Sequence, residues 1–97
     1  MTNVTKFYEY YNYNFRLTKS PNQNSIWIEY SRYSFDNSYY YIKFNKYNND
    51  YIANNVFENE SLIEYLQDIS MITIISKTSF TKEYNLKLTR SALLQIL

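Results

Sequence analysis

The sequence predicts an α+β domain: an antiparallel β-sheet, built as a meander, with one or two short helices packed on one face. Two patterns indicate this class. Apolar and polar residues alternate in successive segments separated by turn-forming residues, and one later segment has the spacing of an amphipathic helix. The length of 97 residues fits one hydrophobic core. We therefore expect residues 1–97 to form a single domain.

Residue usage excludes several kinds of chemistry. The chain has no cysteine, no histidine and no glycine. Thiolate and zinc sites, Ser-His-Asp catalysis and glycine-rich phosphate loops cannot be built without these residues. We therefore expect a protein that is not an enzyme and that binds no metal or cofactor. The net charge of +1 also favours neither an extended nucleic-acid groove nor an acidic nucleic-acid mimic.

Glycine is normally used where turns need a positive φ, and asparagine is the residue that best replaces it. Thirteen asparagines and thirteen tyrosines are consistent with an AT-rich genome, such as that of a phage, an archaeal virus or a mobile element, and equally with that of a low-GC bacterium. The N-terminal residues lack the apolar run of a signal peptide, and no segment has the length of a membrane span. We expect a cytoplasmic protein that acts in the host cell without a membrane partner.

The first segment is predicted to be a short helix. Val4, Phe7, Tyr8 and Tyr11 follow the i, i+3, i+4, i+7 spacing of one helical face, although the tyrosines would also suit a strand. Three alternating segments follow, separated by turn signals at "KSPNQN" and "FDNS". The residues expected on the buried side of these three strands are Tyr13, Phe15, Leu17, Ile26, Ile28, Tyr30, Tyr40, Ile42 and Phe44.

The polar stretch "NKYNNDYIANN" predicts a loop or an irregular excursion that Tyr51 and Ile52 could pin to the domain. "ENESLIEYLQDI" predicts the clearest helix. In that helix Ser61 and Glu64 form a capping-box pair, and Leu62, Leu66 and Ile69 belong to the apolar stripe. Residues 71–76 are rich in β-branched side chains and predict a strand, with an extension of the preceding helix as the alternative. "KEYNLKL" predicts another strand, and "TRSALLQIL" predicts a terminal helix capped by Thr89.

The tyrosines that one buried face does not require form the first candidate site. We expect Trp27, Tyr39 and Tyr41 on the sheet face away from the helices, with Lys43 among the cations nearby; the other two cations are Arg16 and Arg32. Aromatic rings beside cations suit a protein interface and also the stacking of single-stranded nucleic acid. High β propensity combined with AT-rich codons explains the same residues without a binding function.

Four carboxylates within eleven residues form the second candidate site: Glu58, Glu60, Glu64 and Asp68. Glu60, Glu64 and Asp68 recur every four residues, which places them on one side of the predicted helix. They could imitate phosphates or bind a hard cation. A capped helix start with a solvated polar face explains them equally well.

At "NYNFRLT", "NSIWIEY" and "ENESLIEYLQDI", the chain resembles the small phage anti-CRISPR proteins that inhibit type II Cas9. The resemblance covers residues 4–69, with a looser echo at "YNLKLT". It implies a short N-terminal helix, a three-stranded antiparallel sheet and later helices. It also implies a non-enzymatic protein that occupies a nucleic-acid-binding or regulatory surface of a bacterial defence nuclease.

The inhibitory face of that family is acidic and replaces DNA phosphates at the PAM-reading site. By position, the resemblance assigns this role to Asp36, Asp50, Glu58, Glu60, Glu64 and Asp68. This chain differs because it is nearly neutral and carries Lys43 and Lys46 between the acids. An aromatic interface, or inhibition of a different CRISPR effector, therefore fits its residues better than PAM mimicry.

Three functions follow from these features. The first is inhibition of a host defence nuclease by protein–protein interaction, with a Cas effector or its RNA complex as the partner. The second is single-stranded nucleic-acid binding through the Tyr-rich face. The third is a structural role in a virion or scaffold, in which the apolar C-terminal segment forms a homodimer contact.

Overall fold

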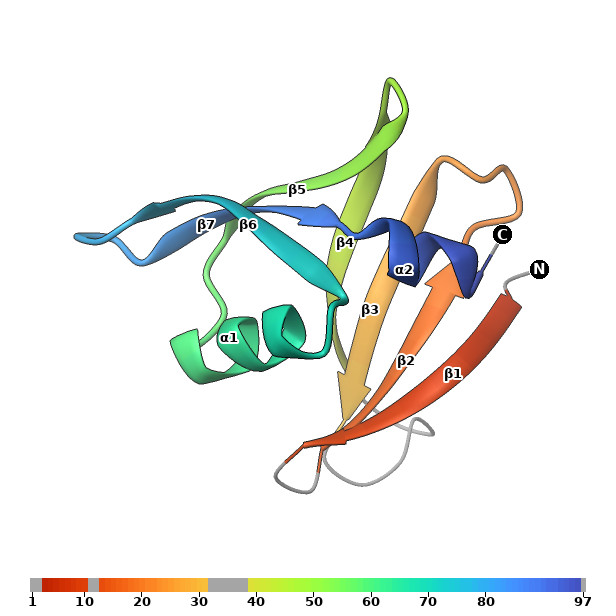
Figure 1. The fold of residues 1–97 in the computed structure, drawn as a ribbon, viewed down its shortest axis with the longest axis horizontal. Helices are drawn as coiled ribbons and strands as arrows, with labels where there is room; N and C mark the ends of the chain where they lie inside the picture. Colours follow the sequence, from red (N-terminus) through yellow and green to blue (C-terminus); the bar gives the residue numbers. More distant parts are fainter. Residues whose placement is uncertain (1–2, 11–12, 32–38, 97) are drawn as a thin grey trace.

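The computed structural model describes residues 3–10, 13–31 and 39–96 of the chain. Its strands form one antiparallel sheet in the order β1-β2-β3-β4-β5-β7-β6, and two short helices follow β5 and β7 (Figure 1). The first five strands lie in chain order, as a meander requires, and only β6 and β7 exchange places. The chain therefore has the predicted α+β class with an antiparallel sheet.

The predicted N-terminal helix is wrong, because this segment is the strand β1 (Asn3–Tyr10). It pairs antiparallel with β2, from Asn3 opposite Lys19 to Tyr10 opposite Tyr13. A helix this short is marginal in isolation, whereas β1 satisfies backbone groups along the edge of β2. Valine, phenylalanine and tyrosine also favour strands. The helical spacing of the four apolar residues was therefore a coincidence.

The next three strands have the predicted alternation. They are β2 (Tyr13–Lys19), β3 (Ser25–Ser31) and β4 (Tyr40–Tyr47), and Leu17 lies opposite Ile28, which lies opposite Ile42. The predicted turn at Pro21 connects β2 and β3, while the predicted "FDNS" turn lies outside the described residues. Tyr40 shares the core side with Ile42 but lies at the strand end, where 66% of it is exposed.

The predicted loop at "NKYNNDYIANN" is also wrong. β4 continues to Tyr47, and β5 (Asp50–Val56) returns after a two-residue turn, so that Tyr47 pairs with Asp50. Asn48 has a φ of 56° in this turn, a conformation that asparagine tolerates better than most residues. Tyr51 is buried and its hydroxyl donates to the Gln23 carbonyl oxygen at 2.5 Å. This anchor holds in place a segment whose polar composition resembles a loop.

The clearest predicted helix is present as α1 (Glu60–Asp68), but its cap is not the predicted Ser61–Glu64 pair. Asn59 caps the helix, since its side-chain oxygen accepts from the Leu62 N–H at 2.7 Å. The three buried residues of α1 are Leu62, Ile63 and Leu66. The apolar stripe therefore orients the helix as predicted, although the helix begins one residue before Ser61.

The C-terminal third follows the prediction closely. β6 (Ile72–Thr78) and β7 (Glu83–Leu88) form a hairpin. The predicted segment 71–76 is therefore a strand from Ile72 onward and not an extension of α1. α2 (Arg90–Leu94) begins after Thr89, whose hydroxyl accepts from the Ala92 N–H at 3.1 Å. The same hydroxyl donates to the carbonyl oxygen of Ser70. The terminal helix is thus fixed to the turn before β6 as well as capped.

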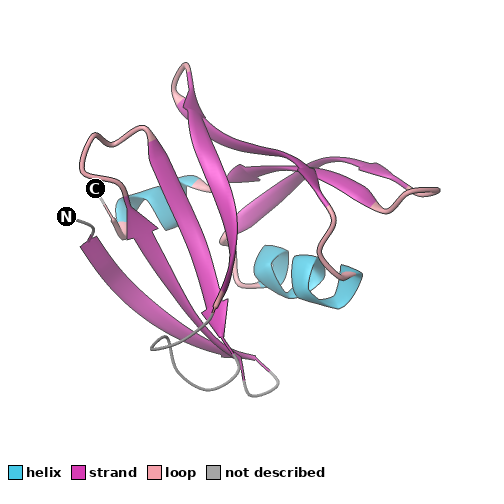
Figure 2. Ribbon diagram, turned by 180° about the vertical axis from the view of Figure 1, so that it is seen from behind, coloured by secondary structure: helices cyan, strands magenta, loops and turns pink. Residues whose placement is uncertain are grey.

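One hydrophobic core joins the sheet and the helices. It combines buried residues of β2 to β7 with Leu62, Ile63 and Leu66 of α1 and with Ala92 of α2 and Ile96 beyond it. The Phe15 ring of β2 lies 5.9 Å from the Tyr65 ring of α1, between centroids. Viewed from behind, α2 lies beyond the meander strands (Figure 2). Along β3, Trp27, Glu29 and Ser31 alternate with the core residues, so their side chains point to the opposite face of the sheet.

Candidate functional site

The predicted aromatic site is assembled on the side of the meander away from the core. Trp27 of β3 lies opposite Lys43 of β4, and Glu29 lies opposite Tyr41 in the next row of the same face. Tyr39 lies directly before β4, two residues from Tyr41, and so belongs to the same face of the sheet as Tyr41. We call the set Trp27, Tyr39, Tyr41 and Lys43 the aromatic platform.

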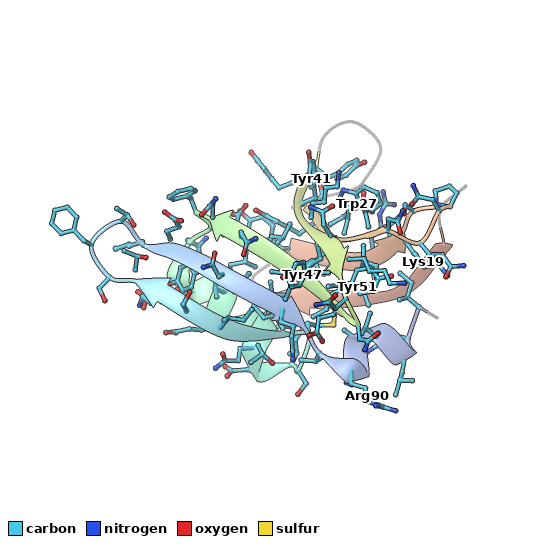
Figure 3. The ribbon with its side chains drawn as sticks, turned by 90° about the horizontal axis from the view of Figure 1, so that it is seen from above. Lys19, Trp27, Tyr41, Tyr47, Tyr51 and Arg90 are labelled. Atoms are coloured by element: carbon cyan, nitrogen blue, oxygen red, sulfur yellow. The ribbon has the colours of Figure 1, made fainter. Side chains whose placement is uncertain are left out.

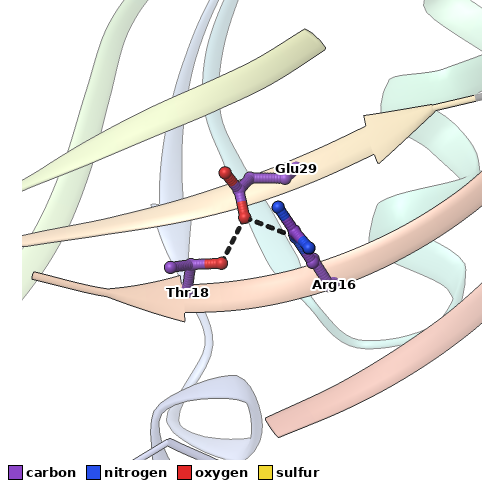
Figure 4. Close-up of polar contacts among 3 residues, drawn as sticks. All are labelled: Arg16, Thr18 and Glu29. Carbon is purple, nitrogen blue, oxygen red and sulfur yellow. Dashed lines mark hydrogen bonds and ion pairs between the residues drawn. The ribbon is translucent and has the colours of Figure 1, made fainter. Parts of the chain in front are cut away.

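The platform is built over a buried carboxylate. The side chain of Glu29 is only 7% exposed, and its Oε1 accepts from the Arg16 Nε at 2.8 Å and from the Thr18 hydroxyl (Figure 4). Arg16 and Glu29 are direct cross-strand neighbours, and Thr18 lies two residues further along β2. A carboxylate this far from water needs a cation and hydrogen-bond donors, and the neighbouring strand supplies both.

Tyr39 is held against this ion pair. The Arg16 guanidinium carbon lies 5.4 Å from the centroid of the Tyr39 ring. The negative charge of Glu29 and a hydrogen bond to its carboxylate raise the pKa of Tyr39 above its usual value, while Arg16 opposes that shift. The ring nonetheless remains 41% exposed, so an ordered aromatic surface faces the solvent.

The other half of the platform is formed by Trp27, Lys43 and Tyr41. The Lys43 ammonium lies 5.6 Å from the centroid of the half-buried Trp27 ring, within the range of a cation–π contact. Tyr41 is 54% exposed. Figure 3 shows Trp27 and Tyr41 on one side of the meander and Arg90, at the start of α2, on the opposite side. All four predicted platform residues are therefore brought together.

The predicted acidic site is not a continuous surface. Glu58 turns toward the core side and hydrogen-bonds to Tyr30, and Glu60 forms an ion pair with Lys77 of β6. Lys77 lowers the pKa of Glu60, and Glu60 raises the pKa of Lys77. Glu64 and Asp68 are exposed on α1. Two of the four acids thus interact with partners outside the aromatic platform, namely Lys77 and Tyr30.

A second aromatic cluster was not predicted as a site. Tyr13, Tyr30, Tyr40, Glu58, Asn59 and Leu62 line a pocket of about 200 Å³. The Tyr30 ring stacks on Tyr40 with 5.5 Å between centroids and contacts the edge of Tyr13 at 6.0 Å. Burial, followed by the hydrogen bond to Glu58, raises the pKa of Tyr30 far above its usual value. This hydroxyl therefore stays protonated and joins the start of α1 to β3.

The remaining predicted residues fall into three groups. Arg32 and Asp36 lie outside the described residues, and Asp50 lies at the β4–β5 turn, 3.7 Å from the Lys87 ammonium. In the C-terminal segment Ala92 and Ile96 are buried in the chain's own core, while Leu94 is 67% exposed. Part of the apolar surface that suggested a homodimer contact is therefore used within the monomer.

Within the described ranges, no three acidic residues lie close enough together to hold a metal ion. None of the helices in this part of the chain has the length and apolar character needed to cross a membrane. Comparisons with protein-family models, with curated proteins and with solved structures find no match to this chain.

Proposed function

We propose that this chain is a non-enzymatic binding protein that docks a partner protein on its aromatic platform. The observation that carries the proposal is a set of Trp and Tyr rings on one face, in which Tyr39 is held against the Arg16–Glu29 ion pair and Trp27 lies under Lys43. Tryptophan, tyrosine and arginine are the residues that most often dominate protein interfaces. Rings already held by neighbours lose less entropy on binding than free side chains do.

The arrangement of charge favours a protein over a nucleic acid as the main partner. Arg16, beside the platform, bonds to Glu29, and Lys43 of the platform lies over Trp27, so both cations already interact within the chain. We further propose that both helices cover the opposite face of the meander. The platform is then one open, flat face with a rigid core behind it.

The resemblance to small anti-CRISPR proteins supplies the class of target. We propose that the partner is a bacterial defence nuclease of the CRISPR type, in its free or RNA-bound form, and that binding inhibits it in the host cytoplasm. The exposed acids Glu64 and Asp68, on the helix side, would steer the encounter with a basic effector through long-range attraction.

The test is binding of the purified chain to purified Cas effectors, with and without guide RNA, together with a DNA-cleavage assay. The double variant Tyr39→Thr/Tyr41→Thr keeps the preference for a strand and removes two rings. We expect it to lose at least tenfold in affinity and to lose inhibition. The matched control is Phe80→Ala, which removes an aromatic ring that is 98% exposed outside the platform.

Two outcomes would contradict this proposal. One is unchanged affinity of the double variant for an effector that the wild-type chain binds. The other is no binding or inhibition by the wild-type chain across effectors of several types. Melting curves of the double variant must accompany both measurements, because a large loss of stability would show that the two rings belong to the folded core.

A second candidate function is binding of single-stranded nucleic acid by the same face. The observation in its favour is that Lys43, Lys46 and Lys87 lie on or beside the outer face, where rings could stack on bases. This function requires affinity for a short oligothymidylate that falls steeply with added salt. Absence of a mobility shift at low salt would eliminate it.

A further inference from the structure

A groove on the outer face, next to the platform, has a different chemistry from the platform itself. It encloses about 790 Å³, and its lining residues are Lys43, Asn45, Lys46, Tyr47, Asp50, Ile52, Asn54, Thr73, Ile75 and Lys87. Lys43 belongs to both sites, because it lines the groove and also lies over Trp27. The groove is therefore continuous with the surface on which the partner is proposed to dock.

One cross-strand row forms the floor of the groove. Asn45 of β4 pairs with Ile52 of β5, Ile52 pairs with Lys87 of β7, and Lys87 pairs with Thr73 of β6. Four strands at a spacing of about 4.8 Å span roughly 15 Å, which corresponds to about five residues of extended peptide. A segment of this length could lie across the strands.

The charge of the groove is unbalanced. Lys43, Lys46 and Lys87 line it together with a single carboxylate, that of Asp50. Asp50 lies 3.7 Å from the Lys87 ammonium and offsets only part of this positive charge. The lining as a whole therefore keeps an excess of two positive charges, and a partly enclosed groove strengthens their attraction for an anion.

The uncharged lining favours a peptide over a nucleic acid. Asn45, Asn54 and Thr73 offer amide and hydroxyl groups that match the donors and acceptors of a peptide backbone. Ile52 and Ile75 offer aliphatic surface, and Ile75 is 53% exposed. Tyr47 supplies the one aromatic ring among the lining residues, whereas stacked bases need a series of rings.

From this geometry we infer that the groove binds an extended acidic segment of about five residues, carried by the protein that docks on the platform. The inference rests on the proposed function, to which it adds the chemistry of the partner. The carboxylates of the segment contact Lys46 and Lys87, and its backbone lies along the row from Asn45 to Thr73. The same partner places its apolar surface on Trp27 and Tyr41.

The test is an NMR titration of the isotope-labelled chain with a pentaglutamate peptide at low salt, with a pentaserine peptide as the uncharged control. Amide shifts should concentrate at the groove floor, and pentaserine should cause none. The variant Lys46→Glu/Lys87→Glu should weaken binding at least tenfold. Lys82→Glu, at the exposed end of the β6–β7 hairpin, is the matched charge reversal and should change it less than twofold.

Further variants separate this inference from the proposed function. Asp50→Asn should tighten pentaglutamate binding several-fold, because it removes the carboxylate beside Lys87. Tyr41→Thr should leave pentaglutamate binding unchanged while weakening binding of the full partner. If effector binding depends on Tyr41 but not on Lys46 and Lys87, the groove inference fails and the platform proposal stands.

Three results would overturn the inference directly. Pentaglutamate could cause no shifts, or shifts that Lys46→Glu/Lys87→Glu leaves intact. A five-nucleotide oligothymidylate could bind the groove more tightly than the peptide, which would assign the site to nucleic acid. Light scattering could show a mass that rises with protein concentration in the wild-type chain but not in Lys46→Glu/Lys87→Glu. That result would show that the acidic α1 of a second copy occupies the groove.

Discussion

Replacing Arg16 by methionine tests whether the outer face is supported by the buried carboxylate of Glu29. Methionine keeps much of the length and apolar character of the arginine stem but removes the charge and the 2.8 Å hydrogen bond. Glu29, with a side chain only 7% exposed, then keeps the Thr18 hydroxyl but loses its cation. An uncompensated charge in this position should destabilise the fold markedly.

The expected magnitude follows from the burial of the two partners. A hydrogen bond to a charged group contributes about 1.5–3 kcal/mol, and removing one partner of a fully buried ion pair costs about 3–5 kcal/mol. The Arg16 side chain is 22% exposed, so water reaches the pair and the lower values apply. We expect Arg16→Met to lower the free energy of unfolding by about 2–3 kcal/mol, or Tm by about 8–24 °C for a domain of this size.

Urea unfolding, followed by the fluorescence of Trp27 and by circular dichroism, measures this loss. The decisive control is the same substitution in a Glu29→Gln background, where the buried side chain is neutral. There Arg16→Met should cost less than about 1 kcal/mol, because no buried charge loses its partner. Equal losses in the two backgrounds would refute the ion-pair account, and so would a loss below about 0.5 kcal/mol in the wild-type background.

Three further predictions concern single sites. Because Lys82 has a φ of 53°, the variant Lys82→Gly should stabilise the protein by about 0.5–1 kcal/mol, as judged by Tm. The neighbouring variant Thr81→Gly should not stabilise the protein. Thr89→Ala should cost about 1 kcal/mol in urea unfolding, because it removes the cap of α2; a loss in the range of a neutral surface change would contradict this. The pKa of Tyr30 is higher in the folded state than in the unfolded state, so its protonated hydroxyl stabilises the fold. This contribution is complete below the pKa of tyrosine in the unfolded chain and is lost as the pH rises above that value. Tyr30→Phe should therefore flatten the fall in stability above about pH 10, and an unchanged alkaline slope would exclude Tyr30 as its source.

The predicted placement of the aromatic residues on one face of the sheet depended on local information, and the strand register agrees with it. Strand alternation fixes which side chains share a face, so Tyr39, Tyr41 and Lys43 could be placed opposite Ile42 and Phe44 without a structure. What the sequence pattern did not indicate is the support beneath the rings. Glu29 lies thirteen residues from Arg16 in the chain, and their contact follows from the register of β2 with β3.

The acidic site shows the opposite case. The regular spacing of Glu60, Glu64 and Asp68 places them on one side of a helix, and they are on that helix. Their availability depends on what lies beside the helix: β6 brings Lys77 to Glu60, and β3 brings Tyr30 to Glu58. Spacing within a helix carries no information about such neighbours.

The groove could not have been found from the sequence. Its floor joins Asn45, Ile52, Lys87 and Thr73, which come from four strands and are spread over more than forty positions of the chain. Two of those strands exchange their order in the sheet. Only the complete pairing brings the three lysines of its lining together.

By itself the sequence determined the features that depend on near neighbours in the chain. These are the α+β class, the alternation of the strands from Tyr13 to Phe44, the helix over Leu62 and Leu66, and the Thr89 cap. Only the tertiary structure decided the state of segments whose local preferences were balanced or weak. The Tyr-rich N-terminus became β1 because β2 offered an edge, and the polar residues after Phe44 became a hairpin that Tyr51 anchors. Backbone hydrogen bonds to a neighbouring strand outweigh a weak local preference, and those neighbours are specified only by the fold.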